Sequence, residues 1–204
     1  MARTPRNVMR LGWVSLLNDI SSEALTRMVP LYTASVLQAP MSAIGLIEGL
    51  ADSTSTLLKP YFGRLSDRLG RRKEFVLWGY AFSALARPFL AIAAGWSEVA
   101  FLRFCDRLGK GVRTAPRDAL LADSTVQGGG GHGRSFGINR AMDTAGALIS
   151  VTGFALWLHF HGETELTAAN WSVLCLGLSI PGILALAVVA FGVKEPKSLA
   201  SAPR

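Results

Sequence analysis

The chain has 204 residues, of which 50% are hydrophobic and only 17% are charged, and its mean hydropathy is +0.33. This composition is more apolar and less charged than that of an ordinary soluble domain, so it argues against a soluble protein and favours an integral membrane protein. The net charge of +7 could suit a nucleic-acid binder. The basic loop segments carry no interleaved aromatic residues, however, so we expect no nucleic-acid partner.

The apolar segments predict the number of membrane spans. A spanning helix needs roughly 20 predominantly apolar residues, and six stretches of about that size follow one another along the chain. In order, the expected spans are 8–37, 42–63, 74–95, 97–121, 134–160 and 171–193. These spans and their short connections use nearly the whole chain, so we expect an all-α membrane protein in which residues 1–204 form a single six-helix transmembrane domain.

The basic residues predict which side of the membrane each connection occupies. They gather at the N-terminus, in the 64–73 connection and in the tail, whereas the connections 38–41, 96 and 161–170 contain none. Basic loops stay on the cytoplasmic side, so we expect a multi-pass protein of the cell inner (plasma) membrane with both termini in the cytoplasm. Tryptophans near the expected helix ends agree with an interfacial belt; they are Trp13, Trp78, Trp96, Trp157 and Trp171.

No residue pattern calls for a metal or a cofactor. Cys105 and Cys175 both lie inside expected spans, so they offer neither a disulfide framework nor a CxxC metal site. His159 and His161 could form a metal pair, but their position favours an ordinary interfacial loop. No spaced nucleophile and base or lipid-substrate motif supports a membrane enzyme, so we expect a protein without enzymatic activity and without a cofactor.

Charged residues inside the expected spans are the strongest functional signal. Each would cost roughly 3 kcal/mol at a lipid-facing helix centre, so as a set they must line a polar interior or a water-filled cavity. Static ion pairs that hold the bundle together are the alternative for any single pair. The residues that we expect to line a translocation or coupling pathway are Asp19, Glu23, Asp52, Arg103, Asp106, Arg107, Lys110, Arg140 and Asp143.

Two motifs resemble those of a known family. Residues 63–73 read GRLSDRLGRRK, and the pattern G-x-L-x-D-x-x-G-R-R-K between the second and third spans resembles the signature loop of the major facilitator superfamily. The stretch RLGKGVRTAP in the fourth span is similar to the family's R-x-x-q-G motif. The NDISSE run of the first span, together with DRLGKGVRTAPRDAL, resembles a prokaryotic subset of that family.

The resemblance implies an alternating-access secondary transporter whose signature loop forms a cytoplasmic gate. Arg71 would then reach Asp118 or Asp123, and Arg107 would carry the substrate-linked or proton-linked charge of the fourth span. One of the carboxylates Asp19, Glu23, Asp52, Asp106 and Asp143 would exchange protons with it. The gate residues implied by the motif are Gly63, Asp67, Arg68, Gly70, Arg71, Arg72 and Asp123.

Two features depart from the family's pattern. Relatives tend to have Gly-Pro in the fifth span where this chain has Ser150-Val151, so the motif associated with antiport is absent. The family is also built from two six-helix halves, and one half has only half a solute site. We therefore expect a membrane-embedded half-size unit that moves a small-molecule substrate after pairing as a homodimer or with a separately encoded second six-helix half. The alternative is a truncated, non-transporting half that acts as a membrane scaffold or is a relic.

Overall fold

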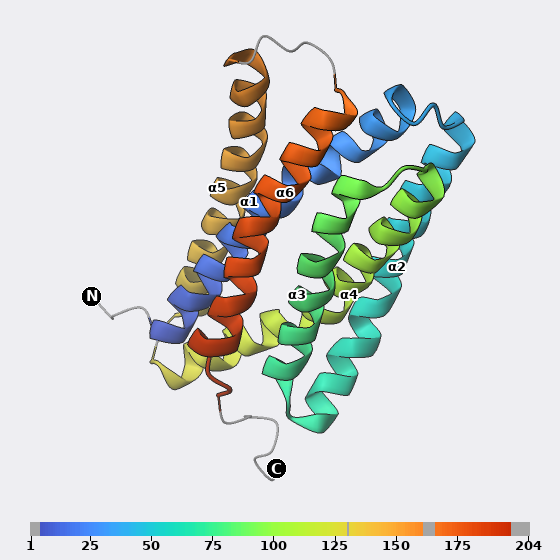
Figure 1. Ribbon diagram of the computed structural model, residues 1–204. Coiled ribbons are helices and arrows are strands. Elements are labelled where there is room, and N and C mark those ends of the chain that lie inside the picture. The colour runs from blue at the N-terminus through green and yellow to red at the C-terminus, as the bar shows by residue number, and fades with distance from the viewer. Residues whose placement is uncertain (1–4, 130, 161–165, 197–204) are drawn as a thin grey trace.

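The computed structural model describes residues 5–129, 131–160 and 166–196, which form six α-helices and no strand. This confirms the all-α architecture expected from the sequence (Figure 1). The helices are α1 (Arg6–Ser35), α2 (Met41–Leu69), α3 (Arg72–Phe89), α4 (Trp96–Gln127), α5 (His132–Phe160) and α6 (Ala168–Ala187). A short 3-10 turn (Leu90–Ile92) extends α3, and a π-helical turn (Val188–Gly192) extends α6.

The second helix is longer than the sequence predicted. We expected a connection over 64–73, but α2 continues to Leu69, and only Gly70 and Arg71 separate it from α3. The hydropathy profile shows where the apolar run ends, whereas the helix ends where a residue breaks its hydrogen-bonding pattern. Gly70 does this with φ at +64°, a left-handed conformation that glycine adopts without strain. The motif glycine Gly70 therefore forms the tight link between α2 and α3.

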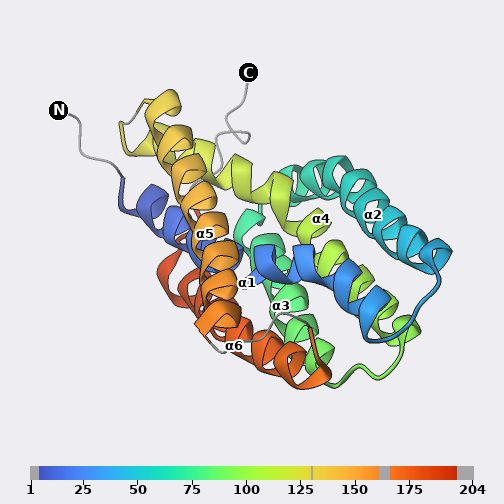
Figure 2. The ribbon, with the colours of Figure 1, turned by 90° about the horizontal axis from the view of Figure 1, so that it is seen from above.

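Two groups of three helices form the bundle. In one group α1 packs against α5 and α6, and in the other α4 packs against α2 and α3 (Figures 1 and 2). Contacts of α3 with α6 and of α1 with α4 join the groups. Helix α1 begins and helix α6 ends at the same end of the bundle, as an even number of spans requires (Figure 1).

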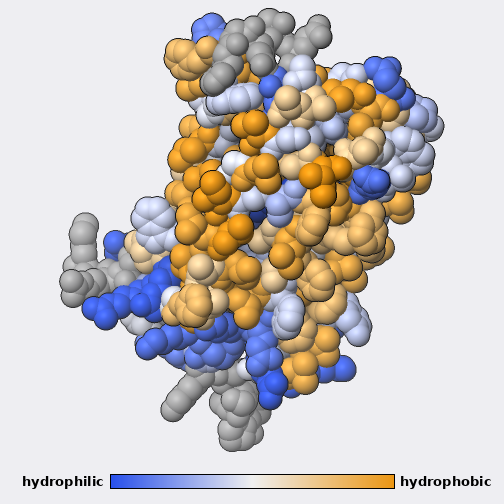
Figure 3. Space-filling model, in the orientation of Figure 1, coloured by the Kyte–Doolittle hydropathy of each residue, from blue (hydrophilic) through white to orange (hydrophobic). Residues whose placement is uncertain are grey.

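The surface has an apolar middle and a charged end. The space-filling view shows hydrophobic residues around the middle of the bundle and hydrophilic residues gathered where α1 begins (Figure 3). By length and composition, three of the described helices can cross a membrane: α3 with its 3-10 turn, α5 and α6. Helices α1, α2 and α4 carry most of the interior charges, so their assignment as spans depends on where those side chains lie.

Paired glycines bring α3 and α4 into close contact. A Cβ atom on Gly79 would lie 2.5 Å from the Cβ of Arg113 and 2.7 Å from the carbonyl oxygen of Gly109. Real Cβ atoms essentially never approach other atoms this closely, so the two backbones can meet only because both positions are glycine. This contact places the α4 arginines directly against the polar side chains of α3.

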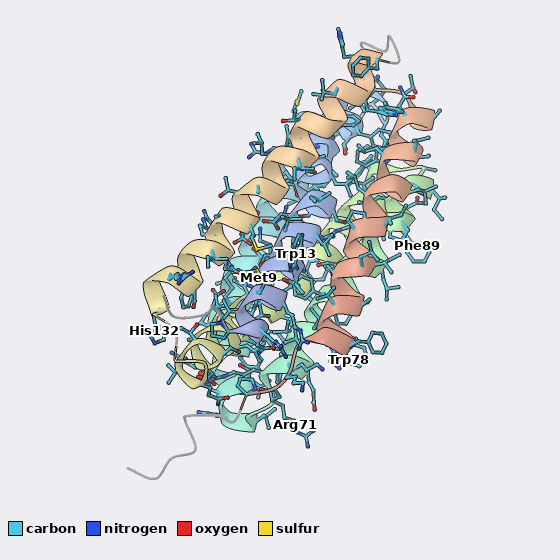
Figure 4. All side chains as sticks on the ribbon, turned by 90° about the vertical axis from the view of Figure 1, so that its left-hand side faces the viewer. Met9, Trp13, Arg71, Trp78, Phe89 and His132 are labelled. Atoms are coloured by element: carbon cyan, nitrogen blue, oxygen red, sulfur yellow. The ribbon has the colours of Figure 1, made fainter. Side chains whose placement is uncertain are left out.

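One of the five tryptophans contradicts the expected interfacial belt. Trp171 is fully buried, stacks on Tyr32 with ring centroids 4.3 Å apart, and donates its Nε1 hydrogen to the carbonyl of Leu90 at 2.8 Å. Trp13 and Trp78 are exposed, as Figure 4 shows. Position near a helix end does not reveal which face of the helix carries the side chain, so the sequence could not separate these cases.

Candidate functional site

Arg72 links three helices at the charged end of the bundle. Its Nε and Nη2 donate to Oδ1 of Asp67 at 3.1 and 2.8 Å, and its Nη1 donates to Oδ2 of Asp123. Nη1 also lies 3.4 Å from the carbonyl oxygen of Ala119. The Arg72 and Asp123 side chains are buried, whereas that of Asp67 is half exposed. The predicted gate acids of α2 and α4 therefore meet on one arginine of α3.

The prediction that Arg71 reaches Asp118 or Asp123 is wrong. Arg71 precedes the first turn of α3 and is exposed, with its Nη1 3.6 Å from Oε2 of Glu74 (Figure 4). Arg72 takes the inward position instead, because one step along a helix turns the side chain by about 100°. Of the other motif residues, Arg68 is exposed and Gly63 allows α2 to approach Ala115 of α4.

The sequence reasoning missed a second contact at this end. Glu195, just beyond α6, accepts hydrogen bonds from the backbone N–H groups of Arg72 at 3.1 Å and Lys73 at 2.5 Å. These groups belong to the first turn of α3, which has no partner within its own helix. Lys73 Nζ also donates to the carbonyl of Ala190 at 2.9 Å. The signal in the sequence was the single acidic residue Glu195 after the last apolar run. It contacts backbone N–H groups, so its partners could not be recognised from residue types.

A polar cavity of about 230 Å³ lies between α1, α4 and α5. Most of the predicted pathway residues line it, including Asp19, Arg107 and Asp143. The lining residues are Asn18, Asp19, Ser22, Glu23, Thr26, Asp106, Arg107, Lys110, Arg113, Thr114, Arg117, Arg140 and Asp143. On each of the three helices these residues are mostly three or four positions apart, so their side chains point to the same side and can line one cavity.

Two predicted pathway residues lie elsewhere. Arg103 is buried next to the cavity, where Nη2 contacts both carboxylate oxygens of Glu48 on α2 at 3.0 and 3.2 Å. Nε of Arg103 also donates to Glu48 at 3.2 Å, so this ion pair connects α2 and α4. Asp52, one turn further along α2, is exposed and does not line the cavity.

Next to the cavity, Arg87 of α3 forms a buried polar network that the sequence did not assign to the site. Its Nη1 donates to Oγ of Ser21 at 2.6 Å, and its Nη2 donates to Oδ1 of Asn18 at 3.0 Å. Nη2 also lies 3.4 Å from Oδ1 of Asp106. Arg87 is only 2% exposed, so the network fixes α1, α3 and α4 relative to one another. The signal in the sequence was an arginine inside the third span, for which no partner could be chosen.

Two further α4 arginines turn inward instead of reaching the membrane surface. Arg113 donates to Oγ of Ser83 at 2.5 Å, and its guanidinium carbon lies 4.4 Å from the centroid of the Tyr80 ring. Arg117 donates to Ser15 at 3.0 Å and pairs with Asp118 at 3.2 Å. Hydroxyl acceptors on α3 and α1 therefore hold these two side chains inside the bundle.

Four cavity charges are incompletely satisfied. Arg107 Nη2 donates to Oγ1 of Thr26 at 3.0 Å, but its buried Nε finds no hydrogen-bond partner among the residues that the structure describes. The nearest Asp106 oxygen is 4.0 Å from this Nε. Among the described residues, the side chains of Lys110 and Glu23 form neither a hydrogen bond nor an ion pair. Oδ1 of Asp143 is buried 3.9 Å from Nη1 of Arg117, and it accepts no hydrogen bond from any described residue.

The described residues contain no group of three His, Cys, Asp or Glu side chains that could hold a metal ion. His159 lies near the end of α5, and His161 is outside the described residues. The cavity presents charged, hydroxyl and amide side chains, which can bind a polar or ionic solute directly.

Comparison with known proteins agrees with this arrangement. The sequence model of the Major Facilitator Superfamily matches residues 11–204. An uncharacterized MFS-type transporter of Methanocaldococcus jannaschii is 40% identical over 147 residues, which cover 72% of this chain and 36% of that protein. An uncharacterized protein of Mycobacterium tuberculosis is 30% identical over 201 residues, which cover 97% of this chain and 47% of that protein. The chain thus spans half or less of these relatives.

The fold is also found among solved structures. A bacterial homolog of the human lysosomal transporter Spinster, in an inward-facing and occupied conformation, superimposes with a TM-score of 0.72 at 16% identity. The match covers 95% of this chain and 45% of that chain. The inward-facing, unoccupied conformation of the same homolog gives a TM-score of 0.68 at 17% identity. With its motifs, its six-helix fold and the family match over almost its whole length, the chain belongs to the major facilitator superfamily.

Proposed function

We propose that this bundle is one wall of a secondary active transporter that moves a small polar or amphipathic solute by proton-coupled alternating access. Membership of the family supports transmembrane transport in general. The observation that carries the proposal is the polar cavity, because it holds incompletely paired charges in the middle of an apolar bundle. Such residues are costly within a membrane and mark solute or ion pathways.

Exposed charges on the bundle support a second wall. Arg27 of α1, Asp52 of α2 and Arg140 of α5 are all exposed although they lie within the expected spans. None of these side chains can face lipid at low cost, so another polar surface must cover them. Gly45 and Gly49 on α2 have open space beside them, which leaves room for a helix to approach closely. A second copy of this chain, a separately encoded bundle or a further segment of the same protein could supply that surface.

The Arg72 cluster suits a conformational gate. Arg72, Asp67 and Asp123 form a charged contact among α2, α3 and α4 at the end that we assign to the cytoplasm of an inner-membrane protein. A contact that forms in one state and opens in the other biases the equilibrium between the two states by its differential stability. The loop that joins α2 to α3 is only two residues long, so movement of Asp67 is transmitted directly to α3.

Carboxylates in the cavity support proton coupling. Asp19, Glu23 and Asp143 come from α1 and α5, and they face the arginines and the lysine of α4. A proton that binds one of them removes a negative charge, which weakens its attraction to α4 and so changes the relative stability of the two transporter states. Replacement of Asp19 with Asn should therefore abolish uptake driven by a pH gradient while solute exchange at equal pH continues.

Cysteine accessibility tests alternating access without knowledge of the solute. Ser22 lines the cavity and differs from cysteine by one atom, so Ser22→Cys is a mild probe. The natural Cys105 and Cys175 are replaced by serine in the background protein. A membrane-impermeant maleimide should label Ser22→Cys when added from either side of oriented vesicles. The matched control is Ile180→Cys on the exposed face of α6, which should remain unlabelled in the lipid.

Labelling from one side only, or from neither side, would contradict alternating access. In that case the polar cavity would be a fixed structural feature, and the bundle would act as a scaffold. The experiment uses the protein together with any partner that copurifies, because the exposed charges indicate that a second polar surface covers them in the working protein.

A further inference from the structure

The polar cavity has two sides of opposite charge. Arg107 and Lys110 lie three positions apart on α4, and Asp19 and Glu23 lie four positions apart on α1. Both spacings place the two side chains on one face of their helix. The cavity therefore separates a pair of cations on α4 from a pair of anions on α1.

Most of the surrounding charges are already paired. Arg103 is held by Glu48, Arg87 by Asp106, and Arg117 by Asp118. Arg113 is occupied by Ser83 and by the Tyr80 ring. These side chains can be explained by the stability of the bundle alone, and they leave few groups with free binding capacity.

The remaining groups are those that face each other across the cavity. Arg107 is only 5% exposed and lines the cavity, yet no described residue provides an acceptor for its Nε. Lys110 and Glu23 both line the cavity, but no ion pair within 4.0 Å forms between them. Within the described part of the chain, Asp19 accepts a side-chain hydrogen bond only from the neighbouring Asn18, at 3.1 Å. Opposite charges that could neutralise each other are thus kept apart by the cavity.

We propose that the cavity binds a small zwitterionic solute, with its anionic group on Arg107 and Lys110 and its cationic group on Asp19 and Glu23. The inference rests on the proposed transport function and names its substrate class. A simple anion would satisfy α4 but would lie near the α1 carboxylates, and a simple cation would have the converse difficulty. A solute with both charges satisfies both sides, because each charged group meets a desolvated partner of opposite sign.

The size of the cavity limits the solute. At about 230 Å³ it is smaller than the pockets of roughly 300–1,000 Å³ that bind drug-sized molecules. Arg140 at its exposed edge comes from α5 and adds a further cation, so the anionic group of the solute has more than one available partner. A molecule with one carboxylate and one ammonium group separated by a short chain fits this volume and charge pattern.

A matched set of small molecules tests the proposal in nanodiscs that contain the full protein with any copurifying partner. The zwitterions are 4-aminobutanoate and glycine betaine, the single ions are butanoate and butylammonium, and the neutral control is butanamide. Thermal unfolding detects binding, and calorimetry then gives Kd. We expect the zwitterions to raise Tm, and the single ions to bind at least ten-fold more weakly.

Variants then identify the two charge sites. Lys110→Gln and Glu23→Gln should each weaken zwitterion binding at least ten-fold, whereas Lys110→Arg should retain it within a few-fold. The double exchange Lys110→Glu with Glu23→Lys should recover part of the loss. Arg64→Gln is the matched control, because Arg64 is exposed on α2 and does not line the cavity. Each variant is compared only after its unliganded Tm and its monodispersity match those of the unmodified protein.

Three results would overturn the proposal. They are a larger Tm increase with single ions than with zwitterions, no binding of either zwitterion, and unchanged affinity in both Lys110→Gln and Glu23→Gln. These results can be separated from failure of the proposed function. If Ser22→Cys is still labelled from both sides, alternating access stands and only the substrate class is wrong.

Discussion

The charged end of the bundle and the central cavity use the same residue types in opposite ways. Arg72 at the charged end has two carboxylates and one carbonyl oxygen as acceptors. Lys110 in the cavity has no side-chain partner among the described residues, although Glu23 lies across from it. The paired Arg72 stabilises one particular packing of the helices, whereas the unpaired Lys110 remains available to bind a solute.

This difference separates structural charges from binding charges. A buried ion pair loses much stability when one partner is removed, because the other charge remains desolvated and alone. Replacement of a charge that is already unpaired leaves no partner charge desolvated and alone. Such a replacement can even stabilise the protein, because it removes a charge that burial disfavours. Stability measurements on single variants should therefore rank the charges by their pairing.

The largest loss is expected for Arg87→Met. Arg87 is 2% exposed and holds Ser21, Asn18 and Asp106, so its removal leaves a buried carboxylate with poorer partners. We expect the free energy of unfolding to fall by about 3 kcal/mol. Unfolding by denaturing detergent in mixed micelles measures the change, with the exposed Arg64→Met as control. An unchanged unfolding free energy would mean that the network contributes nothing to stability.

The Arg72 cluster gives an intermediate effect and an internal comparison. Asp123→Asn weakens a buried charged hydrogen bond and should cost about 2 kcal/mol of unfolding free energy. Asp67→Asn alters a half-exposed partner of the same arginine and should cost less than about 1 kcal/mol. The same detergent assay gives both values. Equal losses would show that exposure does not decide the strength of these pairs.

The all-helical fold could be predicted from the sequence, and the interior charges could be grouped, because both depend on composition. Long apolar runs require helices in a membrane, and charges within those runs require a shared polar interior, so Asp19, Arg107 and Asp143 could be grouped without coordinates. The prediction from sequence failed where a shift of one residue along a helix decides which side chain faces inward. Arg71 and Arg72 are neighbours with the same side chain, and only the starting point of α3 decides which one meets Asp123.

Partners that lie far apart in the chain were also unpredictable. Arg87 could have paired with any acid in the bundle, and its actual contacts with α1 and α4 depend on the packing of three helices. The close approach at Gly79 and Gly109, which positions Arg113, left no periodic signal in the sequence. Trp171 shows the same limit, since a tryptophan near a helix end can face either lipid or the core.

A smaller loss is expected for Glu195→Ala. The Glu195 carboxylate caps the first turn of α3 by accepting from the N–H groups of Arg72 and Lys73. Loss of such a cap costs about 1 kcal/mol. Lys194→Ala is the matched control, because Lys194 contacts Asn7 only through its backbone. If the two variants unfold at the same detergent fraction, the cap does not stabilise α3.

The smallest effect on stability is expected for Lys110→Met. Its ammonium group has no partner to lose, and methionine has a similar length, so the free energy of unfolding should change by less than about 0.5 kcal/mol. A loss above about 1 kcal/mol would mean that Lys110 is paired in the working protein, and the contrast with Arg72 would then disappear. The same variant should lose solute binding while it keeps its stability. That separation of binding from stability is what an unpaired charge in a cavity predicts, because its natural partner is present only when the solute is bound.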